Sequence, residues 1–222
     1  MWEGGFRLEI VCFDTLPSTQ HYLLEALEQG SLEAPVAVLA RVQSAGVGSR
    51  ENGWEGAVGN FFASIALPIA QLPSDLKLPS ASIYFSFVMK QLLNELGYDV
   101  WLKWPNDFYF HDAKIGGTMT QKVGEVVVCG MGINLQNAPE GYCSLESSVE
   151  AEALLRGYLQ KLLAVPSWQE VFSEYAVEFE RSRAFSTHIH STQTSLKASL
   201  LDATLCEDGS LKIKGRRVYS LR

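Results

Sequence analysis

The segment from Trp101 to Gly117 constrains the fold of this chain more than any other stretch. Lys103 stands on the same face of an expected strand as Trp101, because successive side chains of a strand point to opposite faces. Pro105 has no backbone N–H to donate to a sheet and favours an extended residue before it, so we expect the strand to end there in a rigid turn.

The residues after Pro105 predict a return to the first strand. The turn presents Asn106 and Asp107, and residues 108–113 read as a short strand and a second turn that bring Lys114 back beside Lys103. Amide groups can read a base edge, ammonium groups neutralise phosphate, and a carboxylate can hold magnesium. The pattern therefore predicts a nucleotide site, with a lysine stem lying over the edge of a core as the simpler alternative.

Bulk properties limit the classes of protein that fit. The 222 residues are 47% hydrophobic, enough for a substantial core, and the formal charge of −7 argues against non-specific binding to DNA or to a membrane surface. No apolar run approaches the roughly 20 residues of a membrane-spanning helix, and the first residues lack the layout of a signal peptide, so we expect a cytoplasmic protein. The four cysteines are dispersed without zinc-ligand spacing, and His188 with His190 fits a polar strand face.

Apolar periodicity and turn residues predict a mixed α/β chain. We expect strands at 8–14, 36–40 and 61–67, and helices that begin near Ser18 or Thr19, at Ser80 and at the capping box of Ser167. A hairpin is expected to turn near Gly124, and from about residue 185 the pattern changes to short strands. We predict one domain over 1–183 and a small β domain over 184–222, with a tight turn at Asp208 and Gly209.

Two glycine-bearing segments point to close backbone contacts. Residues 44–56 contain four glycines and little periodicity, which predicts a mobile loop in which Arg50 and Trp54 have something to cover. Gly132, preceded by a second glycine two positions earlier, ends a buried strand before Asn134, and a bulge explains that pattern equally well.

In order along the chain, these motifs resemble those of the biotin protein ligases over residues 8–135. They are Ser18-Thr19-Gln20, then Gln43-Ser44-Ala45-Gly46-x-Gly with Trp54, then Lys103-Trp104-Pro105-Asn106-Asp107, Lys114-x-x-Gly117 and Gly130-x-Gly132-Ile133-Asn134. The resemblance implies a mixed α/β sheet with flanking helices, similar to the class II aminoacyl-tRNA synthetase core, followed by a small SH3-like β module.

The same resemblance implies a two-step reaction. Biotin and ATP, with Mg²⁺, would give biotinyl-5'-AMP and pyrophosphate. A lysine of the biotin carboxyl carrier protein of acetyl-CoA carboxylase would then attack the mixed anhydride and form an amide.

Site residues carried over from the resemblance fall into three groups. Ser18, Thr19 and Gln43 would bind the ureido ring, and the whole biotin-binding set is Ser18, Thr19, Gln20, Gln43, Gly46, Val47, Gly48, Ser49, Lys114 and Gly117. The ATP and adenylate set is Trp54, Asn106, Asn134, Gly132 and Lys103. The catalytic set is Lys114, Lys103 and Arg50, with Asp107 near the magnesium.

One departure concerns the glycine-rich loop. The family commonly shows Gly-Arg-Gly-Arg there, whereas this chain has Gly46-Val47-Gly48-Ser49 with arginine displaced to Arg50. We hypothesise that Arg50 takes over the phosphate-side role through a shifted loop path.

Two other functions compete with this interpretation. A lipoate or octanoyl transferase on a related fold would need an apolar, elongated pocket, and an inactive biotin- or nucleotide-binding module is made plausible by the lost loop arginines. Because the first strand begins near Leu8, no helix-turn-helix domain and no DNA binding are expected. The sequence leaves the oligomeric state open, because a sheet edge could either form a homodimer or dock the carrier by strand addition.

Overall fold

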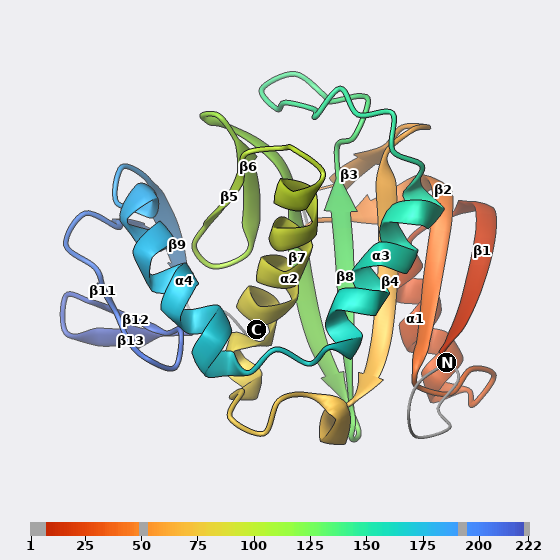
Figure 1. Ribbon diagram of the computed structural model, residues 1–222, viewed down its shortest axis with the longest axis horizontal. Coiled ribbons are helices and arrows are strands. Elements are labelled where there is room, and N and C mark those ends of the chain that lie inside the picture. The colour runs from red at the N-terminus through yellow and green to blue at the C-terminus, as the bar shows by residue number, and fades with distance from the viewer. Residues whose placement is uncertain (1–7, 49–52, 191–194, 220–222) are drawn as a thin grey trace.

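The computed structural model describes residues 8–48, 53–190 and 195–219. The described residues form one mixed sheet in the order β1-β2-β4-β8-β7-β6-β5, with β3 paired to β2 (Figure 1). The pair β1 and β2 is parallel and the other pairs are antiparallel, which confirms the predicted mixed sheet. Its strands are β1 (Glu9–Leu16), β2 (Val36–Val47), β3 (Gly53–Gly56), β4 (Phe61–Pro68), β5 (Val100–Lys103), β6 (Asp107–Phe110), β7 (Ala113–Val123) and β8 (Val126–Ile133).

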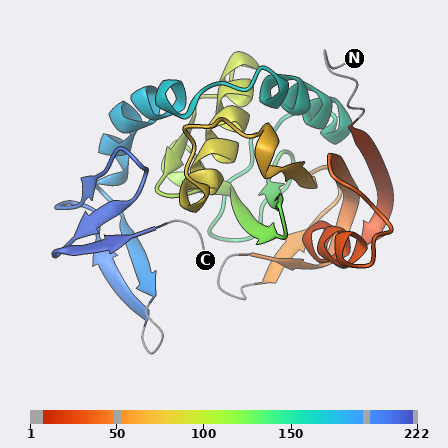
Figure 2. The ribbon, with the colours of Figure 1, turned by 90° about the horizontal axis from the view of Figure 1, so that it is seen from below.

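Helices cover the two faces of the sheet unequally. The helices α2 (Ala81–Glu95), α3 (Ala151–Leu163) and α4 (Trp168–Ser182) lie along one face, and α1 (Thr19–Glu28) lies on the other, over the β1 side (Figure 2). Short 3-10 turns, η2 (Ile69–Gln71) and η3 (Leu78–Ser80), lead into α2. A large apolar cluster fills the space between α2, α3, α4 and the sheet, and a smaller one lies under α1. Polar residues lie on the part of the second face that α1 leaves uncovered.

The described residues after α4 form two small sheets, in agreement with the short C-terminal strands that the sequence predicts. One pairs β9 (Ser186–His190) with β10 (Ser195–Ser199), and the other orders β11 (Thr204–Leu205), β12 (Leu211–Ile213) and β13 (Arg216–Val218). The turn between β11 and β12 falls at Asp208 and Gly209, with Gly209 at φ 76°. The division into domains at residues 183 and 184 stays a prediction.

Helix α4 caps the outer edge of β5. The backbone N–H of Leu102 donates to Glu178 Oε1 at 2.7 Å, and the N–H of Trp104 donates to Ser182 Oγ at 3.0 Å. The second oxygen of Glu178 lies 2.5 Å from Lys90 Nζ in a largely buried ion pair. These side chains satisfy backbone donors that an edge strand otherwise exposes.

Two sequence predictions are corrected. The sequence predicts a mobile loop over residues 44–56. In the described part of that segment, β2 continues to Val47 and pairs with β3, and residues 49–52 lie outside the described residues. A Cβ on Gly56 would lie 2.6 Å from the backbone N and O of Gln43, so this close pairing requires glycine. Ser80 precedes α2, but its side chain accepts no hydrogen bond from a helix N–H. Its hydroxyl is directed to the C-terminal turn, where it donates to Asp208 O. The predicted caps at Ser18 and Ser167 are confirmed.

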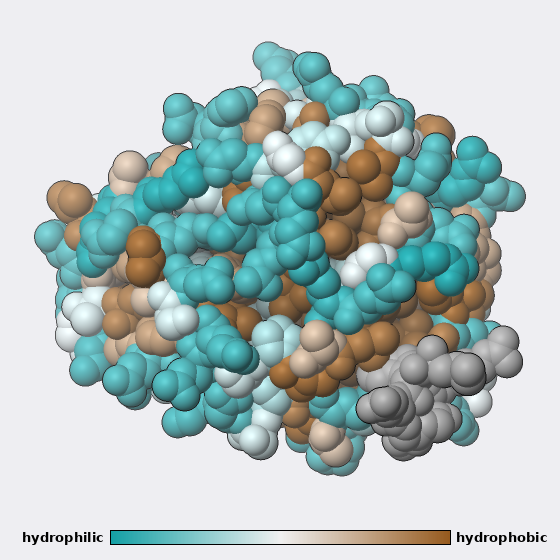
Figure 3. Space-filling model, viewed as in Figure 1, coloured by the Kyte–Doolittle hydropathy of each residue, from teal (hydrophilic) through white to brown (hydrophobic). Residues whose placement is uncertain are grey.

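The face viewed in Figure 3 is mostly hydrophilic, with apolar residues showing between the helices. Across the described ranges, no helix is both long enough and apolar enough to span a bilayer.

Candidate active site

Two lysines converge on one carboxylate where β5, β6 and β7 meet. Lys103 faces Asp107 across the β5–β6 pair, and Asp107 faces Gly117 across the β6–β7 pair. Lys114 Nζ lies 2.6 Å from Asp107 Oδ1 and Lys103 Nζ lies 3.2 Å from Oδ2. The predicted return of Lys114 to Lys103 is confirmed, and the intervening Asp107 holds the two ammonium groups together.

This cluster carries a net positive charge in a sheltered place. The side chains of Lys103, Asp107 and Lys114 are 13%, 18% and 24% exposed. Burial disfavours the charged form of Asp107, but the charges and hydrogen bonds of Lys114 and Lys103 outweigh it and lower the pKa of this carboxyl. Lys103 Nζ also lies 5.8 Å from the ring centre of Tyr109. Burial, with the negative charge of Asp107, raises the pKa of Tyr109 to about 12, so its hydroxyl stays neutral.

Glycines form the floor of the sheet beside this cluster. Gly117 pairs with Gly132, and Gly130 lies two residues earlier on the same face of β8. A Cβ on Gly117 would lie 3.5 Å from Asp107 Oδ1 and 3.8 Å from Lys114 Cε. The floor therefore carries no side chains in front of the lysines, and a ligand can approach the backbone closely.

A second polar cluster lies at the start of α1. Ser64 Oγ donates to Thr19 Oγ1 at 2.9 Å, and Thr19 donates to Gln43 Oε1 from both its N–H, at 2.7 Å, and its hydroxyl, at 3.0 Å. Two donors on one oxygen fix the orientation of the Gln43 amide, which leaves its Nε2 as a directed donor. Gln20 is 6% exposed, and neither of its amide atoms has a partner among the described residues.

The two clusters share one sheet face. Ser64 pairs with Gly130, against which Gln20 packs so closely that a Cβ there would lie 2.5 Å from Gln20 Oε1. Gly132, two residues further along β8, pairs with Gly117 beside Asp107. A continuous glycine-lined strip thus runs from the amide cluster to the lysine cluster.

The residues predicted to bind nucleotide lie around this strip. Asn106 Nδ2 donates to Thr118 O. Asn134 is fully buried, donates from Nδ2 to Cys143 O at 3.2 Å, and has no partner for its Oδ1 in the described chain. The backbone of Trp54 pairs with Gly46 at the β2–β3 end.

Four other predicted site residues follow one another at the end of β2 and just after it in the sequence. Val47 ends β2 and Gly48 follows it, whereas Ser49 and Arg50 lie outside the described residues. The ligand roles assigned to all site residues stay predictions. Sequence reasoning missed Ser64, which a lone hydroxyl in the otherwise apolar run Phe61–Pro68 could have indicated.

The structure gives little support for a resident metal. Within residues 8–48, 53–190 and 195–219, no group of three His, Cys, Asp or Glu side chains is placed to hold an ion. The carboxylate of Asp107 already pairs with two ammonium groups, which leaves it poorly suited to a dication. Magnesium would therefore enter the site with the nucleotide substrate.

Comparisons with known proteins identify the family. A sequence profile described as the Biotin/lipoate A/B protein ligase family matches residues 12–136, more than half of the chain. The bifunctional ligase/repressor BirA of Escherichia coli K12 is 32% identical over 140 residues, which are 60% of this chain and 41% of BirA. The biotin–[acetyl-CoA-carboxylase] ligase of Paracoccus denitrificans is 32% identical over 114 residues, 46% of this chain and 45% of the relative.

Solved structures match over a greater length. The biotin acetyl coenzyme A carboxylase synthetase of Helicobacter pylori, solved with bound biotinylated ATP, is 41% identical, with a TM-score of 0.89 over 96% of this chain and 100% of that one. The biotin protein ligase of Aquifex aeolicus, at 18% identity and a TM-score of 0.74 over 96% of each chain, shares the fold. This chain spans less than half the length of the two curated relatives. It belongs to the Biotin/lipoate A/B protein ligase family.

Proposed function

We propose that this chain is an ATP-dependent ligase that activates biotin as biotinyl-5'-AMP and transfers it to a lysine of a biotin carboxyl carrier protein. The observation that carries the proposal is the pair of lysines on Asp107, joined by a glycine floor to the Thr19 and Gln43 cluster. The biotin-processing relatives from Helicobacter pylori and Paracoccus denitrificans add support.

The lysine cluster suits the first step chemically. A biotin carboxylate oxygen attacks the α-phosphorus of ATP, and the bond from that phosphorus to the bridging oxygen of pyrophosphate breaks. Both reactants are anions and repel each other, so fixed cations that hold them together lower the barrier. Lys114 Nζ gives one of its three donors to Asp107, which leaves two for the carboxylate and the phosphoryl oxygen. Lys103 would stabilise the phosphates from the neighbouring strand.

The second step requires only an amine and a leaving group. The neutral amine of the carrier lysine attacks the acyl carbon, the bond to the phosphate oxygen breaks, AMP leaves, and the amine gives up a proton.

The proposal also includes an acceptor protein and a cellular compartment. The Paracoccus denitrificans relative is named for acetyl-CoA carboxylase, so we infer that the carrier protein of that enzyme is the acceptor. All four cysteines are free thiols, which fits the reducing cytoplasm. A homodimer and the absence of DNA binding, the latter supported by the charge of −7, are parts of this proposal.

Incubation with biotin, MgATP and a carrier domain tests the function. We expect pyrophosphate release that depends on biotin and a mass gain of one biotinyl group on the carrier. Calorimetry with biotin and with lipoate separates the two branches of the family. Tighter binding of lipoate would favour a lipoate ligase, and biotin binding without pyrophosphate release would leave an inactive binding module.

Gln43→Ala is expected to weaken biotin binding by about tenfold to a hundredfold, the value of roughly 1–3 kcal/mol for a lost directed hydrogen bond. The reason is that Thr19 fixes the oxygen of Gln43 and leaves Nε2 as the donor for a ligand acceptor. Isothermal titration calorimetry with biotin measures the change. Gln29→Ala, an exposed glutamine at the far end of α1, is the control and should bind as the wild type does. Equal affinities for Gln43→Ala and the wild type would remove Gln43 from the site.

A further inference from the structure

We propose that the C-terminal turn, residues 206–210, is a positioning device for the lysine–carboxylate cluster, with Gly209 and Trp104 as its positioning residues. The inference rests on the proposed function, because its effect appears in adenylate formation. It assigns a role to a part of the chain that lies outside the matched family segment of residues 12–136.

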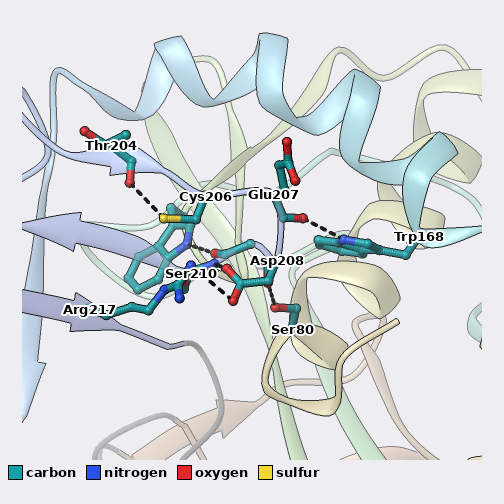
Figure 4. Close-up of polar contacts among 10 residues, drawn as sticks. Ser80, Trp168, Thr204, Cys206, Glu207, Asp208, Ser210 and Arg217 are labelled. Atoms are coloured by element: carbon teal, nitrogen blue, oxygen red, sulfur yellow. Dashed lines mark hydrogen bonds and ion pairs between the residues drawn. The ribbon is translucent and has the colours of Figure 1, made fainter. Parts of the chain in front are cut away.

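Three consecutive carbonyls of the C-terminal turn each accept a hydrogen bond from a different earlier element of the chain. Figure 4 labels two of the donors, Trp168 and Ser80. The donors stand at the first residue of α4, immediately before α2, and immediately after β5. The pairs are Trp168 Nε1 to Glu207 O at 2.8 Å, Ser80 Oγ to Asp208 O, and Trp104 Nε1 to Gly209 O at 2.9 Å.

The C-terminal turn is also braced internally. Asp208 Oδ1 accepts from Ser210 N at 3.2 Å and from Ser210 Oγ at 2.5 Å, and Arg217 Nε donates to Ser210 Oγ at 2.9 Å. Gly209 N donates to Cys206 O at 2.8 Å. Ser210 is fully buried. A turn with this many internal bonds can hold Trp104 in place instead of yielding to it.

Trp104 connects the C-terminal turn to the site. It stands between Lys103, the last residue of β5, and Asp107, the first residue of β6. Its side chain is 2% exposed, its backbone N–H donates to Ser182 Oγ at 3.0 Å, and its indole N–H is taken by Gly209 O. A shift of this ring would move the ends of both strands, and Lys103 and Asp107 would move with them.

Gly209 is the position where the docking can be disturbed without touching the site. A Cβ there would lie 2.9 Å from Ser80 Oγ, 2.9 Å from Ile83 Cδ1 and 3.1 Å from Trp168 Cη2. Any side chain at this position therefore pushes the turn away from α2 and α4. Gly215 provides a matched control in the next turn of the same sheet. Its φ of 75° equals the 76° of Gly209 within a degree, and no atom lies within 4 Å of its added Cβ.

The test compares Gly209→Ala with Gly215→Ala in the full chain. Both alanines strain the backbone equally, because the two glycines have nearly the same φ. A difference between the variants therefore reports the contacts that the added Cβ makes at position 209. We expect Gly209→Ala to lower biotin-dependent ATP–pyrophosphate exchange by about tenfold to a hundredfold, as for a small misplacement of catalytic groups. Biotin stoichiometry, measured by calorimetry, should stay at the wild-type value. Biotin affinity should fall by much less than the exchange rate, because Thr19 and Gln43 lie on other elements than the displaced cluster. Gly215→Ala should change the exchange rate by less than about twofold.

The possible outcomes separate the role of the C-terminal turn from the proposed ligase function. Equal exchange rates in the two variants overturn the inference and leave the proposed function intact, whereas a wild-type chain without exchange overturns both. If Gly209→Ala loses biotin binding as well, its fold is damaged and Ser80→Ala decides instead. That variant removes the donor to Asp208 O without straining the backbone. A several-fold slower exchange with normal biotin binding supports the inference, and a wild-type rate overturns it.

Discussion

Lys114→Ala is expected to abolish the formation of biotinyl-5'-AMP or to slow it by at least about a hundredfold, the usual effect of removing one group that stabilises developing charge. Lys114 Nζ lies 2.6 Å from Asp107 Oδ1, beside a glycine floor on which both reacting anions can meet. Alanine removes the cation that would offset their repulsion, and it leaves Lys103 paired with Asp107. The site would then carry no net positive charge.

Biotin-dependent pyrophosphate exchange measures this loss. Lys122→Ala is the matched control, because Lys122 lies on the same strand and makes an exposed ion pair with Glu125 at 3.3 Å. It removes the same charge from the protein without touching the cluster, and such surface pairs contribute little. Near-equal rates for Lys114→Ala and Lys122→Ala would show that Lys114 takes no part in activation.

Asp107→Asn is expected to damage both the reaction and the fold. The carboxylate holds Lys103 and Lys114 at 3.2 Å and 2.6 Å, and the carboxamide has nearly the same shape but no charge. Two ammonium groups would then face each other without a counterion and separate. We expect exchange to fall by about tenfold or more. The free energy of unfolding should fall by about 1–3 kcal/mol, less than for a fully buried ion pair because the cluster is partly exposed.

The pH dependence gives this prediction a second readout. The pKa of Asp107 is lowered in the folded state, so its contribution to stability is fully present above the ordinary aspartate pKa of about 3.9. That contribution is lost as pH falls through the lowered folded value. The difference in free energy of unfolding between the wild type and Asp107→Asn should therefore be constant from pH 7 to about pH 5 and shrink below about pH 4.

Urea denaturation at several pH values measures both quantities. Asp14→Asn is the control, since the Asp14 side chain is 93% exposed and its oxygen lies 3.7 Å from Arg41. It should leave exchange and the shape of the pH dependence unchanged. A difference for Asp107→Asn that grew as pH fell would contradict a lowered pKa.

Local sequence patterns were enough to predict that the two lysines of the site lie close together. The return of Lys114 to Lys103 depends on two short strands and two turns, which alternation and Pro105 indicate directly. The packing of the C-terminal turn was not visible, because Trp104 and Gly209 stand 105 positions apart and no local preference couples them. Ser80 illustrates the same limit. It has the residue type of a helix cap, but its hydroxyl serves a distant carbonyl that the sequence does not reveal.

The glycine-rich segment shows a different limit. Few apolar residues and four glycines indicate a loop, yet glycine also permits the close approach of two strands, and Gly56 uses that freedom against Gln43. The pairing partner, not the residue composition, decides between the two outcomes.

The capping of β5 by α4 prevents another strand from pairing with that edge of the sheet. Glu178 and Ser182 occupy the outward N–H groups at that border, so a new strand finds no vacant donors there. Within the described chain, β1 at the opposite border has β2 as its single neighbour. Lengthening of this sheet by another polypeptide is therefore directed away from β5, to β1 or to β3, which among the described strands also pairs with β2 alone.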